Sequence, residues 1–135
     1  MHDDELATLG RSLRRIDGRL LRRAPTDDAR RIWFQGTEPY FDVTIEVDDD
    51  GEVRWLEITL RGSSLTLDVA KRELKTGITN EREVSETAFP SSKTIAPDRD
   101  PRVVFVDRMV RLLEHGSDAA LHAAAHAVRA HRDRR

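Results

Sequence analysis

The chain of 135 residues contains no cysteine, only seven aromatic residues and only three lysines. Without cysteine it can form neither a disulfide nor a cysteine-ligated metal site, and a cytoplasmic location is expected. It also lacks the roughly 20 consecutive apolar residues that a membrane-spanning helix needs, so no membrane partner is expected. The first residues, Met1 to Glu5, are mostly acidic with no apolar signal region, so secretion is not predicted.

The net charge of −2 is too close to zero to predict a nucleic-acid partner. Its distribution along the chain is uneven. Residues 11–31 hold eight arginines and three aspartates, whereas residues 38–57 hold eight acidic residues and a single arginine. An arginine-rich helix could follow phosphates, but the acidic segment that comes next argues against nucleic acid.

Residues 32–69 predict a three-stranded antiparallel meander. Apolar and polar residues alternate from Phe41 to Val47, which is typical of a strand with one buried face. Asp50-Gly51 suits a two-residue type I′ hairpin turn. This turn sets Val43 opposite Ile58, so that the apolar residues of both strands share one face.

Gly62-Ser63 suits a second two-residue turn, of type II′. It would set Leu60 opposite Leu65 and Glu57 opposite Asp68. Like charges directly opposite each other are unfavourable, which suggests a site that gives up stability for binding. The predicted binding residues are the polar and aromatic side chains of this second face: Asp42, Glu46, Trp55, Glu57 and Asp68.

A narrow apolar stripe predicts an N-terminal helix from about Asp4 to Arg23, followed by Pro25. Its spacing of three and four residues is that of a helix that packs on a partner helix. Two interpretations are open: the helix packs on the sheet of its own domain, or it pairs with its copy in a homodimer. The predicted interface residues are Leu6, Leu9, Leu13, Ile16 and Leu20.

Beyond residue 69 the pattern predicts a fourth strand over Leu74 to Ile78 and a polar, flexible loop over residues 85–100. Asp100-Pro101 is a typical helix start, with an N-cap residue before a proline. The helix that follows is apolar around most of its circumference, so it is expected to be the most buried one.

Gly116 is expected to end that helix, and Ser117 to cap a last, alanine-rich helix that runs to about His131. Residues 132–135 are then expected to form a frayed basic tail. These two helices are expected to form an αα-hairpin on the apolar face of the sheet.

No catalytic residue, metal or cofactor is predicted. His122 and His126 stand four residues apart, a spacing at which two imidazoles can share a metal, but a third ligand is missing. Residues 48–52 resemble a calcium loop at first sight. They lack its alternating ligands, and a hairpin turn explains them.

These patterns predict one α+β domain over residues 1–135, with an antiparallel sheet of three to five strands, one N-terminal helix and a C-terminal αα-hairpin. The predicted function is that of a small, non-enzymatic protein–protein interaction domain that forms a homodimer. An alternative is a binder that resembles secretion chaperones or immunity proteins in size and layout only, and uses its acidic sheet face on a basic protein partner. A third is an enzyme or metal-binding protein with a carboxylate site.

Overall fold

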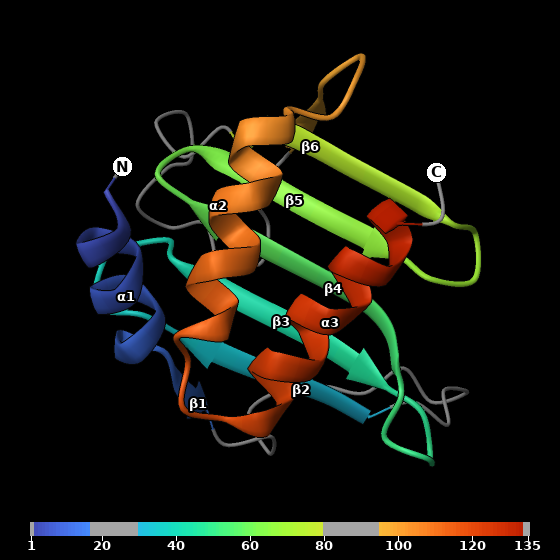
Figure 1. Cartoon of the computed structure of the whole chain (residues 1–135), viewed down its shortest axis with the longest axis horizontal. Helices are drawn as coiled ribbons and strands as arrows, with labels where there is room; N and C mark the ends of the chain where they lie inside the picture. The colour runs from blue at the N-terminus through green and yellow to red at the C-terminus, as the bar shows by residue number, and fades with distance from the viewer. Residues whose placement is uncertain (1, 17–29, 80–94, 134–135) are drawn as a thin grey trace, which may run out of the picture.

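The computed structural model describes residues 2–16, 30–79 and 95–133, and places three helices on one face of an antiparallel sheet (Figure 1). In chain order the described elements are α1 (Asp3–Ser12), β1 (Arg14–Ile16), β2 (Arg30–Gln35), β3 (Asp42–Val47), β4 (Val53–Leu60), β5 (Ser63–Asp68), β6 (Glu73–Thr79), β7 (Ile95–Pro97), α2 (Val103–Glu114) and α3 (Ala119–Asp133). This confirms the α+β class and the helices on one face. The described sheet has seven strands rather than three to five. Strands β1 and β7, of three residues each, are too short to show period two, and β2 has three consecutive apolar residues in place of an alternation.

The sheet is a meander in which each strand pairs antiparallel with the next one along the chain. Its helix-facing side chains are fully buried, among them Phe34, Val43 and Ile58. Across the core, α2 contributes Met109 and Leu112, which are equally buried. The core therefore lies between the sheet and the helices, and the other face of the sheet carries the polar half of each strand.

The β3–β4 register confirms the prediction, with Val43 opposite Ile58. The turn itself is longer than expected. The Asp48 amide donates to the Glu52 carbonyl at 2.9 Å, and the Gly51 amide donates to the Asp48 carbonyl at 3.0 Å, with Gly51 at a φ of 82°. A bulge between Glu46 and Val47 absorbs the extra residue, so the predicted pairing beyond it is kept.

The β4–β5 register differs from the prediction by two residues. The two central turn residues are Arg61 and Gly62, both with positive φ as a type I′ turn requires, and Leu60 therefore pairs with Ser63. A shift of two residues leaves every side chain on its predicted face. It nevertheless separates the acidic pair: Glu57 lies opposite Thr66, and Asp68 lies opposite Trp55. The predicted Glu57–Asp68 pairing is wrong.

The N-terminal helix is shorter than predicted. It ends at Ser12, Leu13 has an extended backbone, and Ile16 belongs to strand β1, whereas Leu20 lies outside the described residues. The first three residues of the predicted stripe, Leu6, Leu9 and Leu13, are 1–5% exposed and belong to the core of their own protomer. They cannot also form a homodimer interface without opening the domain. Figure 1 shows α1 lying beside α2 instead.

The predicted fourth strand is confirmed within β6, but two details of the C-terminal half differ. Strand β7 lies inside the segment 85–100 that was predicted as a flexible loop. Strand β7 depends on its pairing with β6, and the mainly polar segment 85–100 has no alternation of apolar residues that would predict a strand. At the other end, α3 continues through the first two residues of the predicted tail 132–135, where Arg132 forms an ion pair with Asp107 of α2.

The helix starts differ as well. Helix α2 begins at Val103 with no side-chain cap. Val103 and Val104 are more than 60% exposed, so the first turn of α2 lies outside the core, contrary to the prediction. The cap of α3 is Asp118 rather than Ser117: its Oδ1 accepts a hydrogen bond from the Ala120 amide at 2.9 Å.

Candidate functional site

The residues predicted as a binding face do share the helix-free side of the sheet, and each is partly exposed. Glu46, Trp55 and Asp68 form one row across three strands. Several of the acids already have partners within the fold. Arg31 donates to Glu46 at 3.1 Å, and Asp68 accepts the Lys71 amide at 3.1 Å.

The other two acids of this face, Asp42 and Glu57, take part in interactions as well. Within the row Glu46 forms an ion pair with Arg31, and Asp68 accepts a hydrogen bond from a backbone amide. That a basic protein binds to it stays a prediction, and so does the homodimer.

Among the described residues, no third metal ligand is grouped with the histidine pair of α3. His122 and His126 are exposed, and His122 Nε2 lies 2.6 Å from the Gly116 carbonyl oxygen. Within residues 2–16, 30–79 and 95–133, no three His, Asp or Glu side chains are grouped closely enough to hold a metal ion.

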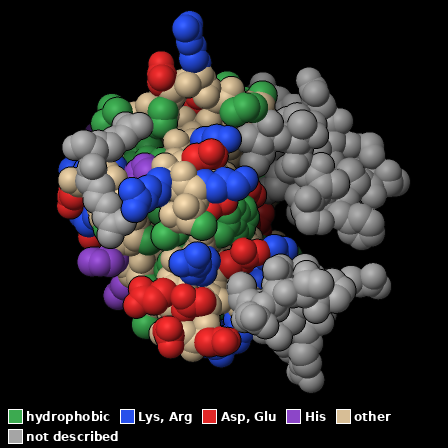
Figure 2. All heavy atoms as spheres, turned by 90° about the vertical axis from the view of Figure 1, so that its right-hand side faces the viewer, with side chains coloured by type: hydrophobic (Ala, Val, Ile, Leu, Met, Phe, Trp, Pro, Cys, Tyr) green, Lys and Arg blue, Asp and Glu red, His purple; other side chains and the backbone are tan. Residues whose placement is uncertain are grey.

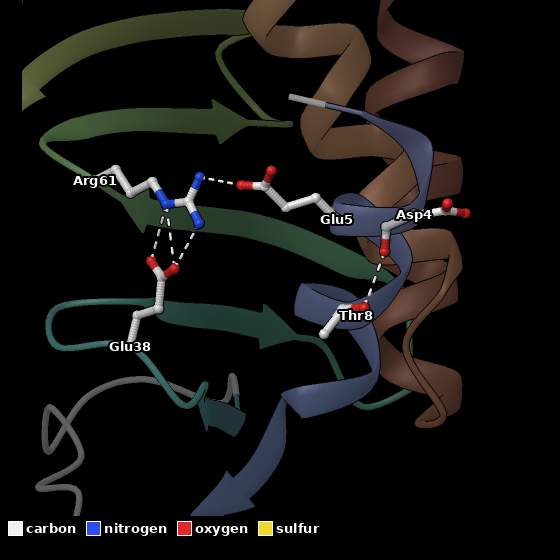
Figure 3. Close-up of polar contacts among 5 residues, drawn as sticks. All are labelled: Asp4, Glu5, Thr8, Glu38 and Arg61. Carbon is white, nitrogen blue, oxygen red and sulfur yellow. Dashed lines mark hydrogen bonds and ion pairs between the residues drawn. The ribbon is translucent and has the colours of Figure 1, made fainter.

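A polar cluster around Arg61 joins three parts of the chain (Figure 3). From the β4–β5 turn, Arg61 donates to Glu38 of the β2–β3 loop at 2.6 and 3.0 Å and forms an ion pair with Glu5 of α1. Within α1, the Thr8 hydroxyl donates to the Asp4 carbonyl at 2.9 Å. The hydrogen bond from Arg61 holds the pKa of Glu38 below its usual value. The cluster ties α1 to the sheet and acts as a structural clamp.

Replacing Arg61 with glutamine should lower the free energy of unfolding at pH 7 by about 0.5–1.5 kcal/mol, since two partly exposed ion pairs are lost. The lowered pKa of Glu38 means that its contribution is present above the usual glutamate pKa and is lost as the pH falls through the folded-state value. Urea titrations at pH 7 and about pH 3 should show the gap between wild type and variant closing in acid.

Arg11→Gln is the control, because Arg11 is exposed and has no ion pair among the described residues. It should leave stability unchanged at both pH values. A gap for Arg61→Gln of the same size at pH 7 and pH 3 would contradict the clamp.

A groove of about 790 Å³ lies between α3 and the β5–β6 hairpin. One wall is Ala123, Ala127 and Ala130, which the helical spacing puts on one side of α3. The opposite side of α3 packs into the core through Leu121, Ala124, Ala125 and Val128. Because alanine side chains are short, the first wall leaves open space above the sheet.

The floor and rim of the groove come from the sheet and from the segment that leads into α2. The described lining residues other than the alanines are Gly51, Glu52, Val53, Leu67, Val69, Arg72, Glu73, Leu74, Lys75, Pro97, Asp98, Arg99, Pro101 and His131. Figure 2 looks onto the side of the molecule that carries the β5–β6 turn, and shows hydrophobic side chains between charged ones of both signs. The groove thus has aliphatic walls and a charged rim.

Some of the rim charges are neutralised within the fold. Lys75 lies 3.3 Å from Glu73. Asp98 accepts hydrogen bonds from the Thr76 hydroxyl at 2.6 Å and from Arg102 at 2.8 Å, and these bonds lower its pKa. The Asp98 carboxylate therefore already has two hydrogen-bond partners, and it links Arg102, at the start of α2, to Thr76 of β6.

Other rim charges have no such partner. Arg72 and Arg99 are exposed and form no ion pair with any residue that the structure describes, and the same holds for Glu52. The described rim thus offers two unpaired cations against one unpaired anion.

The sequence patterns did not indicate this groove. Its residues come from positions 51 to 131 and meet only in the tertiary structure. The one local signal is the alanine-rich composition of the last helix, and this composition does not show which alanines face a cavity. Ala124 and Ala125 of the same helix are buried in the core instead.

None of the described helices is long and apolar enough to cross a membrane. Comparisons of the chain with protein-family models, with curated proteins and with solved structures found no match in any of the three.

Proposed function

We propose that this chain is a non-enzymatic binding protein whose groove between α3 and the β5–β6 hairpin holds an elongated aliphatic ligand. The observation that carries the proposal is the groove itself. Its volume of about 790 Å³ falls within the range of roughly 300–1,000 Å³ typical of small-molecule sites, and such sites combine apolar walls with a few polar groups.

The chemistry of the lining supports an aliphatic ligand over a planar one. The described walls and floor consist of alanine, valine, leucine and proline. No Phe, Tyr or Trp is among the described lining residues, where the one aromatic ring is the imidazole of His131. Nucleobases and other flat rings are usually held by stacking on aromatic side chains. An aliphatic chain needs only apolar surface, which this groove supplies along α3 and β5.

The proposal predicts a dependence on chain length. Each methylene group removed from water contributes about 0.8 kcal/mol, so affinity should rise roughly fourfold for each added carbon until the groove is full. The measurement is displacement of a neutral fluorescent probe, N-phenyl-1-naphthylamine, by octan-1-ol, decan-1-ol and dodecan-1-ol.

Ala127→Trp should abolish probe and alcohol binding, because an indole at the centre of the alanine wall fills the groove. Ala119→Trp is the matched control: Ala119 lies on the same helix, is exposed and does not line the groove. Circular dichroism establishes that both variants are folded. Equal binding by wild type and Ala127→Trp, or no binding by wild type, would overturn the proposal.

A further inference from the structure

Arg72 stands at a backbone position where glycine is the easier residue. In the β3–β4 turn, the amide of Gly51 donates to the carbonyl three residues earlier, and Gly51 has a φ of 82°. In the β5–β6 turn, the amide of Arg72 donates in the same way to Val69, with a φ of 53°. A non-glycine residue costs roughly 1–2 kcal/mol in this left-handed region.

The other arginine with positive φ has an evident role for its side chain. Arg61, at a φ of 51°, binds Glu38 and Glu5, and these contacts account for an arginine in a strained turn. Arg72 has no ion pair among the described residues, yet it lines the groove. Arg72 therefore stands at the rim in a strained backbone conformation that no described contact of its side chain explains.

Arg99 adds a second cation to the same rim, on the segment between β7 and α2. Since Asp98 and Glu73 are already engaged with Arg102 and Lys75, these acids do not neutralise it. An apolar groove with two unpaired guanidinium groups at its edge is complementary to an aliphatic chain that ends in an anion. Guanidinium groups match carboxylates in shape as well as charge, through paired N–H donors.

We propose that the ligand of the groove is a long-chain aliphatic carboxylate, whose chain lies along Ala123, Ala127 and Ala130 and whose carboxylate is bound by Arg72 and Arg99. This rests on the proposed function, since it names the head group of a ligand that occupies the same groove.

The test compares three ligands that share one chain and differ only in the head group: dodecanoate, dodecan-1-ol and dodecylammonium. Displacement of N-phenyl-1-naphthylamine at low ionic strength gives the three dissociation constants. Dodecanoate should bind wild type about tenfold or more tightly than dodecan-1-ol, because charge-assisted hydrogen bonds are added to the same chain contacts. Dodecylammonium should bind more weakly than the alcohol.

In the double variant Arg72→Gln with Arg99→Gln, the affinity for dodecanoate should fall to within about twofold of the affinity for dodecan-1-ol. The affinity for dodecan-1-ol should stay at its wild-type value. The charge-matched control is Arg11→Gln with Arg54→Gln. Both of these arginines are exposed, form no ion pair among the described residues and do not line the groove, so the preference for dodecanoate should persist.

The outcomes separate this inference from the function on which it rests. Equal affinities for dodecanoate and dodecan-1-ol in wild type would overturn the proposal of a carboxylate head group, whereas the proposed aliphatic binding function of the groove would stand. A carboxylate preference that survives in the double glutamine variant would overturn the assignment to Arg72 and Arg99. Absence of binding by all three ligands would remove both proposals.

Discussion

Replacing Gly10 with alanine is expected to lower the free energy of unfolding by about 2 kcal/mol or more, although alanine is the better helix former. A Cβ atom at this position would lie 2.2 Å from the carbonyl oxygen of Leu112 and 2.9 Å from Cβ of His115. The backbone of α1 can approach α2 this closely because residue 10 has no side chain. An added methyl group must push the two helices apart, and overpacking of this kind typically costs 1–3 kcal/mol or more.

In an exposed helix position the same change would instead stabilise by about 1 kcal/mol, so the sign of the effect tests the contact between the helices. Urea denaturation measures it. Thr8→Ala is the control: Thr8 lies two residues from Gly10, on the exposed side of α1, and the change should stay within about 0.5 kcal/mol. A Gly10→Ala protein more stable than wild type would show that α1 does not pack on α2 in this way.

Leu112→Ala is expected to cost about 2–5 kcal/mol, the range for truncating a fully buried leucine. The Leu112 side chain is 0% exposed and belongs to the core cluster between the helices and the sheet. Its loss leaves a cavity that the surrounding helices and strands can close only in part. Denaturant unfolding followed by tryptophan fluorescence and by circular dichroism gives the free energy and shows whether the transition stays cooperative.

The neighbouring Arg111→Ala is the control for Leu112→Ala. Arg111 is exposed and forms an ion pair with Asp3, which is itself largely exposed, so its loss should cost less than about 1 kcal/mol. A loss below about 1 kcal/mol for Leu112→Ala would mean that this side of α2 is not part of the core.

The residues at positive φ connect stability with the proposed binding site. Arg61 and Arg72 both occupy left-handed turn positions, but only Arg61 has ion pairs within the described structure. Strain without an intramolecular compensation is common at binding sites, where a side chain is kept for a ligand. This contrast makes the groove rim a stronger candidate than the acidic sheet face, where Glu46 and Asp68 have partners within the fold.

Local pattern alone determined the strands β3 to β6, the faces of these strands and the two C-terminal helices. Period two depends only on the alternation of side chains and fixes the face of each one. Val43 lies opposite Ile58 as predicted, although the turn is longer than predicted, because the bulge between Glu46 and Val47 offsets the extra residue. The face assignment also survived the error at Gly62, because a register shift of two residues returns each side chain to its face.

Tertiary structure decided everything that depends on which elements meet. The stripe Leu6, Leu9 and Leu13 fits a helix dimer or an intramolecular contact equally well, and only the packing of α1 on α2 assigned it to the core. Strands β1 and β7 form because a neighbouring strand supplies their hydrogen bonds. A stretch of three residues is too short for its sequence to predict this pairing. The groove arises in the same way: the alanine side of α3 becomes a wall only once β5, β6 and the turn at Arg72 are set opposite it, since a cavity is a property of distances between elements and not of any one segment.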